Sequence, residues 1–410
     1  MIRRVTVSLA LVVFFPSTAA AFTIRGHGWG HGVGMSQWGA RGLADHGWGW
    51  RGILAHYYPG TELSRVTHVK VHVLVRQGRR AVAFSARTPF RIVDARGASR
   101  LQRRRIVFRA HTWHGLRPPL RIVAGAQPVA VDGAGYRGSF VVRRGIDVVN
   151  VVPLERYLCG VVPWEMPKRW NGEALRAQAV AARTYTVANL GRVVYADTRD
   201  QMYGGIRAED PATNRAVGAT AGRILTWNGA PAKTFYFSTS GGRTQSSQDA
   251  FNGAAIPYLR SVADPYDWGP KHDWTYRFTP LQLARRLHVP RPRSLSVRLN
   301  SSGWVASVVV GSRTISASDF ERALDLPSTH FRVGSGAPPH AVHRARVRPL
   351  AGWVAVLETA SRKFPGSVAT SSLRGLRPGL WVRIRGPFRA RNDAVAAAGS
   401  AGYVRRVVRR

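Results

Sequence analysis

Six short apolar runs between residues 65 and 152 limit the fold more than any other feature of this sequence. Each run is rich in β-branched residues, and clusters of Gly, Pro or Arg separate it from the next. The runs read "HVKVHVLV", "AVAFSA", "RIVFRA", "PLRIVA", "GSFVVRR" and "DVVNVVP". This pattern predicts short strands joined by turns, and therefore a β-rich domain.

The pattern becomes helical after residue 152. "PLERYLCGVV" predicts a short helix that begins at Pro153, because proline is favoured in the first helical turn. "NGEALRAQAVAARTYTVANLG" predicts the clearest helix, with Asn171 as N-cap and Gly191 as its stop. One face of this helix is formed by Leu175, Ala179, Ala182, Thr186 and Leu190. Further strands, such as "RILTWNG" and "AKTFYFSTSGG", follow up to residue 333, so the fold class is α+β.

The N-terminus has the features of a secretory signal peptide. Residues 1–21 combine a basic start (Arg3, Arg4), an apolar run over 5–15 and small residues before Phe22. That run is shorter than the about 20 residues of a membrane span, and no later run is long enough. We therefore expect a secreted protein without a transmembrane span.

The C-terminus predicts a linker and a second domain. Residues 334–349 carry Gly, Pro and Arg without periodicity, as linkers do. In residues 350–410, the strand-like runs "GWVAVLE", "GLWVRIRGPF" and "GYVRRVV" surround the helical run "ARNDAVAAAGS". These runs predict a small α+β unit.

The formal net charge is +40, which attracts polyanions. For an exported protein those are cell-wall polymers or phospholipid headgroups, so we expect no nucleic acid partner. A compositional preference for arginine explains the charge equally well. The single cysteine, Cys159, excludes an intrachain disulfide and predicts a small buried side chain.

Glu165 is the most informative acid. It lies in "VVPWEMPKRW", where Pro163 and Pro167 exclude a continuing helix and Trp164 and Trp170 flank the carboxyl. Contact with indole rings would desolvate the carboxyl and raise its pKa, which suits a proton donor. On the local sequence alone, a surface glutamate in a proline-rich turn is the favoured alternative.

Other candidate sites are less specific. Arg183, inside an alanine-rich helix, needs an acceptor, which is either a protein carboxylate or a ligand. Ser238, Ser240 and Gly241 in "FSTSGGRT" fit either sugar recognition or a tight turn. Several histidines lie near the N-terminus, but HExxH and Cys–His spacings are missing, so we predict no metal and no cofactor.

Long motifs resemble the SpoIID/amidase-enhancer family, named after stage II sporulation protein D. They are "NVVPLERYLCGVVPWEMPKRWNGEALRAQAVAARTYTVAN", "YRGSF", "DQMYGG", "FYFSTSGGRT", "PYLRSVADPYD" and "LDLPSTHF". The resemblance implies a β-rich SpoIID-type catalytic domain over 22–333, with a central helix that carries the active-site motif. It also implies that the protein is a lytic transglycosylase acting on peptidoglycan glycan strands.

In this family the acid in the Glu-Met step is catalytic, which implies that Glu165 is the catalytic residue here. Such an enzyme uses one carboxyl as acid and then as base, and leaves 1,6-anhydromuramyl ends. Positions that match family motifs, together with two from the N-terminal segment, are expected to bind substrate: Gln178, Arg183, Tyr203, Ser238, Ser240, Gly241, His31 and Gln37. The alternatives are a muramidase and a non-catalytic amidase activator, with a cell-wall amidase as partner.

Two further expectations follow from the resemblance. The segment "GWGHGVGMSQWGARGLADHGWGWRGILAHYYPGT" is similar to one that usually closes the domain, so residues 22–62 look permuted to the N-terminus. Residues 25–60 should then pack beside 325–333 and the Glu165 cleft. The tail, 350–410, resembles a SPOR domain, a ferredoxin-like unit that binds denuded glycan.

Overall fold

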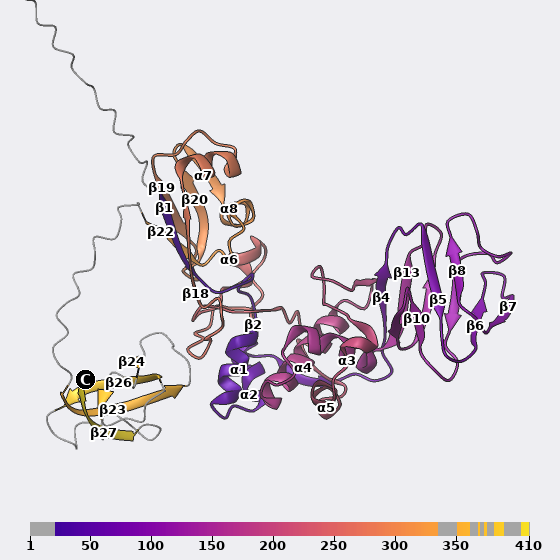
Figure 1. Cartoon of the computed structure of the whole chain (residues 1–410), viewed down its shortest axis with the longest axis horizontal. Helices are drawn as coiled ribbons and strands as arrows, with labels where there is room; N and C mark the ends of the chain where they lie inside the picture. The colour runs from indigo at the N-terminus through magenta and orange to yellow at the C-terminus, as the bar shows by residue number, and fades with distance from the viewer. Residues whose placement is uncertain are drawn as a thin grey trace, which may run out of the picture. The chain divides into compact units, whose positions relative to one another are not determined.

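The computed structural model describes residues 21–334 and, beyond them, the backbone of strands over 351–360, 368–369, 373–374, 381–388 and 403–409 (Figure 1). The chain divides into two units, Met1–Gly336 and Ala337–Arg410. The predicted signal peptide, up to residue 20, and the predicted linker, from residue 335 onward, lie outside the described residues. No helix in the described part is long and apolar enough to cross a membrane.

Two β-sheets that share one hydrophobic core form the first part of the larger unit. Their orders are β14-β4-β13-β12-β9-β6-β7 and β11-β10-β5-β8. The strands are β4 (Lys70–Arg76), β5 (Ala81–Ser85), β6 (Phe90–Val93), β7 (Ser99–Gln102), β8 (Ile106–Arg109), β9 (Leu120–Val123), β10 (Val129–Val131), β11 (Ala134–Tyr136), β12 (Ser139–Val142), β13 (Val148–Pro153) and β14 (Val194–Tyr195). Alternate residues point inward, and Phe84, Phe108 and Phe140 fill the core. All six predicted strands are confirmed.

A helical layer follows, and a second core joins N-terminal helices to the central helix. Its elements are α1 (Gln37–Asp45), α2 (Trp50–Tyr57), α3 (Leu154–Glu165), α4 (Gly172–Ala188), η1 (Gly205–Ala208), α5 (Pro211–Ala219) and α6 (Ser247–Phe251). Short strands accompany them: β2 (Met35–Ser36) with β17 (Tyr236–Phe237), and β3 (Glu62–Arg65) with β15 (Arg223–Trp227) and β16 (Ala230–Pro231).

The central helix α4 begins as predicted and ends earlier. The Asn171 side chain caps it by accepting a hydrogen bond from the backbone N–H of Glu173. Its C-cap is Asn189, so the expected stop at Gly191 is wrong by two residues. Leu190 consequently lies beyond the helix and is exposed, while the other four residues of the predicted face are buried.

The N-terminal strand β1 (Phe22–His27) is the middle strand of a sheet with β18 (Asp273–Phe278) and β22 (Phe331–Gly334). Gly26 pairs with Phe331, and Ile24 is fully buried. The same part holds β19 (Leu295–Leu299), β20 (Val305–Val310), β21 (Arg313–Ser316), α7 (Pro280–Leu287) and α8 (Ala317–Leu324). The segment that resembles a domain end thus packs beside 325–333, as expected.

The second unit contains an antiparallel sheet with the order β24-β26-β23-β27-β25. Its strands are β23 (Ala351–Ala360), β24 (Val368–Ala369), β25 (Leu373–Arg374), β26 (Trp381–Phe388) and β27 (Tyr403–Arg409). Four of these strands follow the order of a ferredoxin-like sheet, in which the first strand lies between the third and the fourth. The predicted helix over 390–400 lies outside the described residues.

Candidate active site

A cavity of about 390 Å³ lies at the C-terminal end of α3. Glu165, the last residue of α3, lines it together with side chains from the N-terminal segment, α4 and β17. The lining residues are His31, Gln37, Glu165, Tyr185, Thr198, Arg199, Asp200, Met202, Phe235, Tyr236, Phe237, Ser238 and Phe251. The cavity therefore gathers residues from four distant parts of the chain.

The helix α3 reaches Glu165 despite Pro163. Pro163 lies inside α3, so our expectation that prolines on both sides exclude a helix there is wrong. The helix ends at Glu165 because Pro167 disfavours helical backbone at Met166, which is extended with φ −130° and ψ 138°. This sharp end places the Glu165 side chain at the helix terminus.

The Glu165 carboxyl is held by neutral donors. Its Oε2 accepts a hydrogen bond from Gln37 Nε2 at 3.3 Å, and its Oε1 accepts one from the Met202 backbone N–H at 3.3 Å. The Tyr236 hydroxyl is a third hydrogen-bonding partner. Desolvation raises the pKa of Glu165, and these three hydrogen bonds only partly oppose it. The group is thus suited to hold a proton.

Trp164 and Trp170, which we expected to flank the Glu165 carboxyl, do not line its cavity. Trp164 is 58% exposed and does not line the cavity. Trp170 packs against Trp38, with ring centroids 4.8 Å apart. The apolar wall comes instead from residues that the sequence did not single out, among them Phe235, Tyr236 and Phe237.

Three of the predicted substrate residues reach the cavity: His31, Gln37 and Ser238. The His31 ring packs against Phe237 and Phe251, with centroids 5.4 and 5.8 Å away. Burial lowers the pKa of His31 to about 4, so its imidazole is neutral at physiological pH. Its Nδ1 accepts a hydrogen bond from the Val33 backbone N–H, which leaves Nε2 as the atom that carries the proton.

Arg183 and Tyr203 are structural residues here, which corrects their expected role as substrate contacts. Arg183 is fully buried and bonds both Glu155 oxygens, with Nε–Oε1 and Nη2–Oε2 distances of 2.8 and 2.7 Å. It also donates to the Val217 carbonyl at 3.1 Å. Tyr203 is buried in the first core, and its hydroxyl donates to Asn150 Oδ1 at 3.0 Å.

Gln178, Ser240 and Gly241 also lie outside the cavity lining, contrary to expectation. Gln178 is fully buried inside α4. The Ser240 hydroxyl is buried and donates to Asp264 Oδ2 at 2.8 Å. Gly241 has a φ of +68°, and an added Cβ there would lie 2.4 Å from His27 Cβ. The Ser240 hydrogen bond and the close packing of Gly241 are contacts within the fold, while the buried Gln178 amide has no hydrogen-bond partner among the described residues.

Asp200 is a cavity residue that sequence reasoning missed, although it begins the quoted motif "DQMYGG". Its carboxylate accepts hydrogen bonds from Arg192 Nη1 at 2.8 Å, the Tyr185 hydroxyl at 2.9 Å and the Tyr195 backbone N–H at 2.8 Å. Desolvation alone would raise its pKa, but these bonds outweigh it and the pKa is lowered. Asp200 is therefore an ionised carboxylate whose lone pairs are already engaged.

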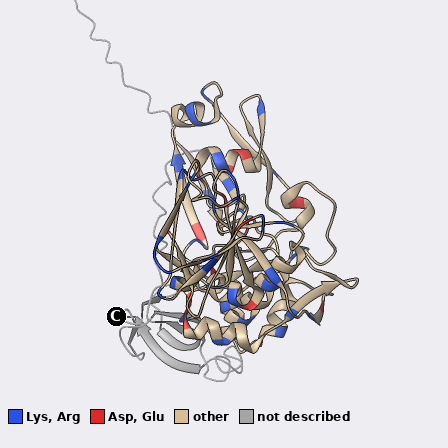
Figure 2. Cartoon of the chain, turned by 90° about the vertical axis from the view of Figure 1, so that its right-hand side faces the viewer, with Lys and Arg blue, Asp and Glu red and all other residues tan. Residues whose placement is uncertain are grey.

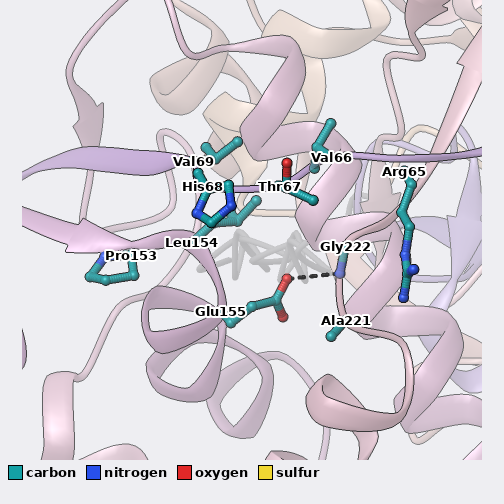
Figure 3. Close-up of a pocket in the computed structure, with 10 residues that line it drawn as sticks. All are labelled: Arg65, Val66, Thr67, His68, Val69, Pro153, Leu154, Glu155, Ala221 and Gly222. Atoms are coloured by element: carbon teal, nitrogen blue, oxygen red, sulfur yellow. Dashed lines mark hydrogen bonds between the residues drawn. The ribbon is translucent and has the colours of Figure 1, made fainter.

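A second pocket, of about 420 Å³, lies at the opposite end of α3 and contains Glu155 (Figure 3). Figure 3 shows the Glu155 carboxylate pointing toward the backbone N–H of Gly222, which donates to Oε1 at 3.0 Å. Arg183 binds the same carboxylate. Glu155 is thus fixed in an ion pair and is not a free proton donor.

One group of residues in the described part could hold a metal ion: His27, His272 and Asp273. Their spacing along the sequence gave no sign of it, because β1 and β18 are far apart in the chain and adjacent in the sheet.

Comparison with known proteins finds a family model that matches part of this domain. Residues 142–227, which include α3, α4 and Glu165, match the family model described as "SpoIID: Stage II sporulation protein". This part of the chain is similar to the SpoIID family. The comparisons give no support to a SPOR-type assignment of residues 350–410.

Individual relatives match part of the chain. "Stage II sporulation protein D" of Bacillus subtilis (strain 168) is 33% identical over 217 residues, 47% of this chain and 63% of the relative. "Amidase enhancer" of the same organism is 36% identical over 159 residues, 39% of this chain and 21% of the relative. An uncharacterized protein of Brachyspira hyodysenteriae (strain ATCC 49526 / WA1) is 31% identical over 222 residues, 50% of this chain and 60% of the relative. The chain thus covers less than two thirds of each relative's length.

Proposed function

We propose that this protein is an extracytoplasmic lytic transglycosylase that cleaves peptidoglycan glycan strands, with Glu165 as its single acid and base. The observation that carries the proposal is the environment of Glu165. Its carboxyl faces a 390 Å³ cavity, is held by neutral donors, and has a raised pKa. A carboxyl that holds its proton more readily than a free one, and that faces a cavity, suits the protonation of a glycosidic oxygen.

The reaction needs one carboxyl and no water. The protonated Glu165 gives its proton to the glycosidic oxygen as the bond from that oxygen to C1 breaks. The resulting carboxylate then takes the proton of the muramyl 6-hydroxyl while the 6-oxygen bonds to C1. A 1,6-anhydromuramyl end forms, and Glu165 regains its proton for the next cycle.

The neighbours of Glu165 support this exchange of a proton. Gln37 and the Met202 N–H donate to the carboxylate form and stabilise it after the first step. Gln201 Nε2 donates to the Tyr236 hydroxyl at 3.0 Å and fixes the third partner. Phe251, 46% exposed at the cavity, offers an apolar face on which a sugar ring can stack.

A muramidase fits the cavity less well. A hydrolase of the usual kind needs a second carboxyl, about 5–9.5 Å from the first, that is free to activate water or to attack C1. Asp200 is the other carboxylate that lines the cavity, and its lone pairs bind Arg192, Tyr185 and Tyr195. A single-carboxyl mechanism therefore agrees best with the site.

A second candidate is a non-catalytic activator of a cell-wall amidase. It is favoured by the 36% identity to a relative named "Amidase enhancer". The net charge of +40 also suits anionic wall polymers, and Figure 2 shows Lys and Arg spread widely with few Asp and Glu between them. In that case the cavity would bind glycan without cutting it.

The test uses peptidoglycan freed of stem peptides by an amidase. The full chain should release fragments with 1,6-anhydromuramyl ends, Glu165→Gln should release none, and Glu62→Gln, an exposed acid outside the cavity, should match the wild type. Absence of any cleavage, combined with faster amidase turnover when the protein is added, would favour the activator instead.

A further inference from the structure

Three strands bring four metal-ligating side chains to one place at the end of β1. His27 is the last residue of β1 and pairs with Asp273, the first residue of β18. His272 immediately precedes Asp273, and His330 immediately precedes β22. The group belongs to the sheet of the third core and lies outside the lining of the Glu165 cavity.

The distances within this group are short. Asp273 Oδ1 lies 2.7 Å from His27 Nδ1, and Asp273 Oδ2 lies 2.9 Å from His272 Nδ1. One ligand atom from each of the three residues falls within 4.8 Å of the other two. The ring of His330 is a fourth neighbour, with its centroid 5.2 Å from that of His27.

We propose that His27, His272 and Asp273 form a binding site for a divalent transition-metal ion, Zn²⁺ foremost. Two imidazole nitrogens and one carboxylate oxygen are ligands that Zn²⁺ accepts, and they leave a fourth position open. Ligand atoms around a tetrahedral Zn²⁺ stand about 3.3 Å apart, given bonds of about 2.0–2.1 Å. Small side-chain rotations therefore suffice to reach the bound arrangement. Mg²⁺ and Ca²⁺ prefer all-oxygen sites and are disfavoured.

An unsatisfied ring nitrogen is a second, independent observation. His27 Nδ1 is buried and has no aligned hydrogen-bond partner, although Asp273 Oδ1 approaches to 2.7 Å. A buried polar atom without a hydrogen bond carries an energetic cost in a folded protein. Coordination of a cation by this nitrogen would remove that cost.

The backbone holds the three ligands in place before any ion binds. The His27 N–H donates to the His330 carbonyl at 2.8 Å, and the Gly28 N–H donates to the His272 carbonyl at 3.1 Å. The His272 ring also stacks on Trp268, with centroids 4.5 Å apart and an angle of 22°. Such preorganisation is what a metal site needs from its surroundings.

A bound ion would stabilise the position of β1 and of the N-terminal segment that follows it. β1 leads directly into the stretch that carries His31 and Gln37 to the Glu165 cavity. A metal bound to one residue of β1 and two at the start of β18 would join these strands. Binding to the folded state alone would stabilise the fold in proportion to the ion concentration. This consequence does not depend on the proposed enzymatic activity.

The test measures metal binding by the full chain after treatment with a chelator. Zn²⁺ should raise the melting temperature, and Co²⁺ should give the visible absorption of a tetrahedral site. His27→Ala and His272→Ala should weaken binding at least about 10-fold. His111→Ala, an exposed histidine outside the group, should bind like the wild type.

Asp273→Asn keeps the shape of the side chain, so it tests the site even if the two alanine variants fail to fold. It should fold, as judged by circular dichroism, and lose the Zn²⁺-dependent rise in melting temperature. The proposal is overturned if the wild type shows neither the temperature shift nor the Co²⁺ spectrum. It is equally overturned if His27→Ala and His272→Ala fold and bind Zn²⁺ as tightly as the wild type, which would place the ion elsewhere.

Discussion

Glu155 and Glu165 lie on the same helix, at its first and last turns, and each faces a pocket of similar volume. Glu155 binds the buried guanidinium of Arg183 and the Gly222 N–H. Glu165 receives only neutral donors. The Arg183 cation holds the Glu155 carboxylate in a structural ion pair. Glu165 has no such cation among its partners and is free to exchange a proton. The two pockets are similar in volume, so the charge of the hydrogen-bonding partners is what distinguishes the structural acid from the candidate catalytic acid.

Replacing Glu165 should produce the largest effect. Glu165→Gln keeps the shape of the side chain but removes the proton, so cleavage of denuded glycan should fall at least about 100-fold. Chromatography of the released peptide-free glycan fragments measures the rate of cleavage, and circular dichroism is the control for folding. A well-folded variant that retains most of its activity would show that another group supplies the proton.

Replacing Glu155 should affect stability instead. Glu155→Gln leaves the fully buried Arg183 without a counter-charge, which should cost about 3 kcal/mol of unfolding free energy. Urea denaturation measures this loss. Activity per folded molecule, assayed well below the unfolding transition, should stay near the wild-type value. A specific loss of turnover without loss of stability would reverse the roles that we assign to the two acids.

A smaller effect is expected at Gln37. Because its amide donates to the ionised carboxyl, Gln37→Leu should raise the pKa of Glu165 further. The reaction begins with protonated Glu165, so activity declines as pH rises through that pKa. In the variant, this decline in kcat/KM should move to higher pH. An unchanged profile would mean that the Gln37 contact does not act on the carboxyl.

The smallest effect concerns stability near neutral pH. Desolvation raises the pKa of Glu165 in the folded state, so its ionised form opposes folding. Stability attributable to this group is present below its unfolded pKa and declines as pH rises through the folded pKa. Glu165→Gln should therefore melt slightly higher than the wild type at pH 7 and equally at pH 4. A lower melting temperature at pH 7 would contradict the desolvation argument.

Much of the fold could be predicted because local patterns determine it. Period-two alternation in "HVKVHVLV" identifies β4, and the Asn171 cap identifies the start of α4. The end of α3 was missed because proline is disfavoured inside helices in general, yet Pro163 is accommodated in this one. Local rules give preferences, which tertiary packing can override.

The candidate site was predictable only in part. Glu165 was found through family motifs, but those motifs also contain residues that serve packing, such as Arg183 and Tyr203. No pattern in a single sequence separates residues of the site from residues that serve packing. Asp200 and Tyr236 were missed because their roles arise from contacts between distant segments. The metal-binding group is hidden for the same reason.

The most direct test of the central claim is isotope analysis of the cleavage products. Denuded glycan is cut in water enriched in ¹⁸O, and the new ends are examined by mass spectrometry. A single-carboxyl transglycosylase should give 1,6-anhydromuramyl ends, one water lighter than reducing ends and free of ¹⁸O. Reducing ends that carry ¹⁸O would contradict the claim, because water and a second catalytic group would then take part.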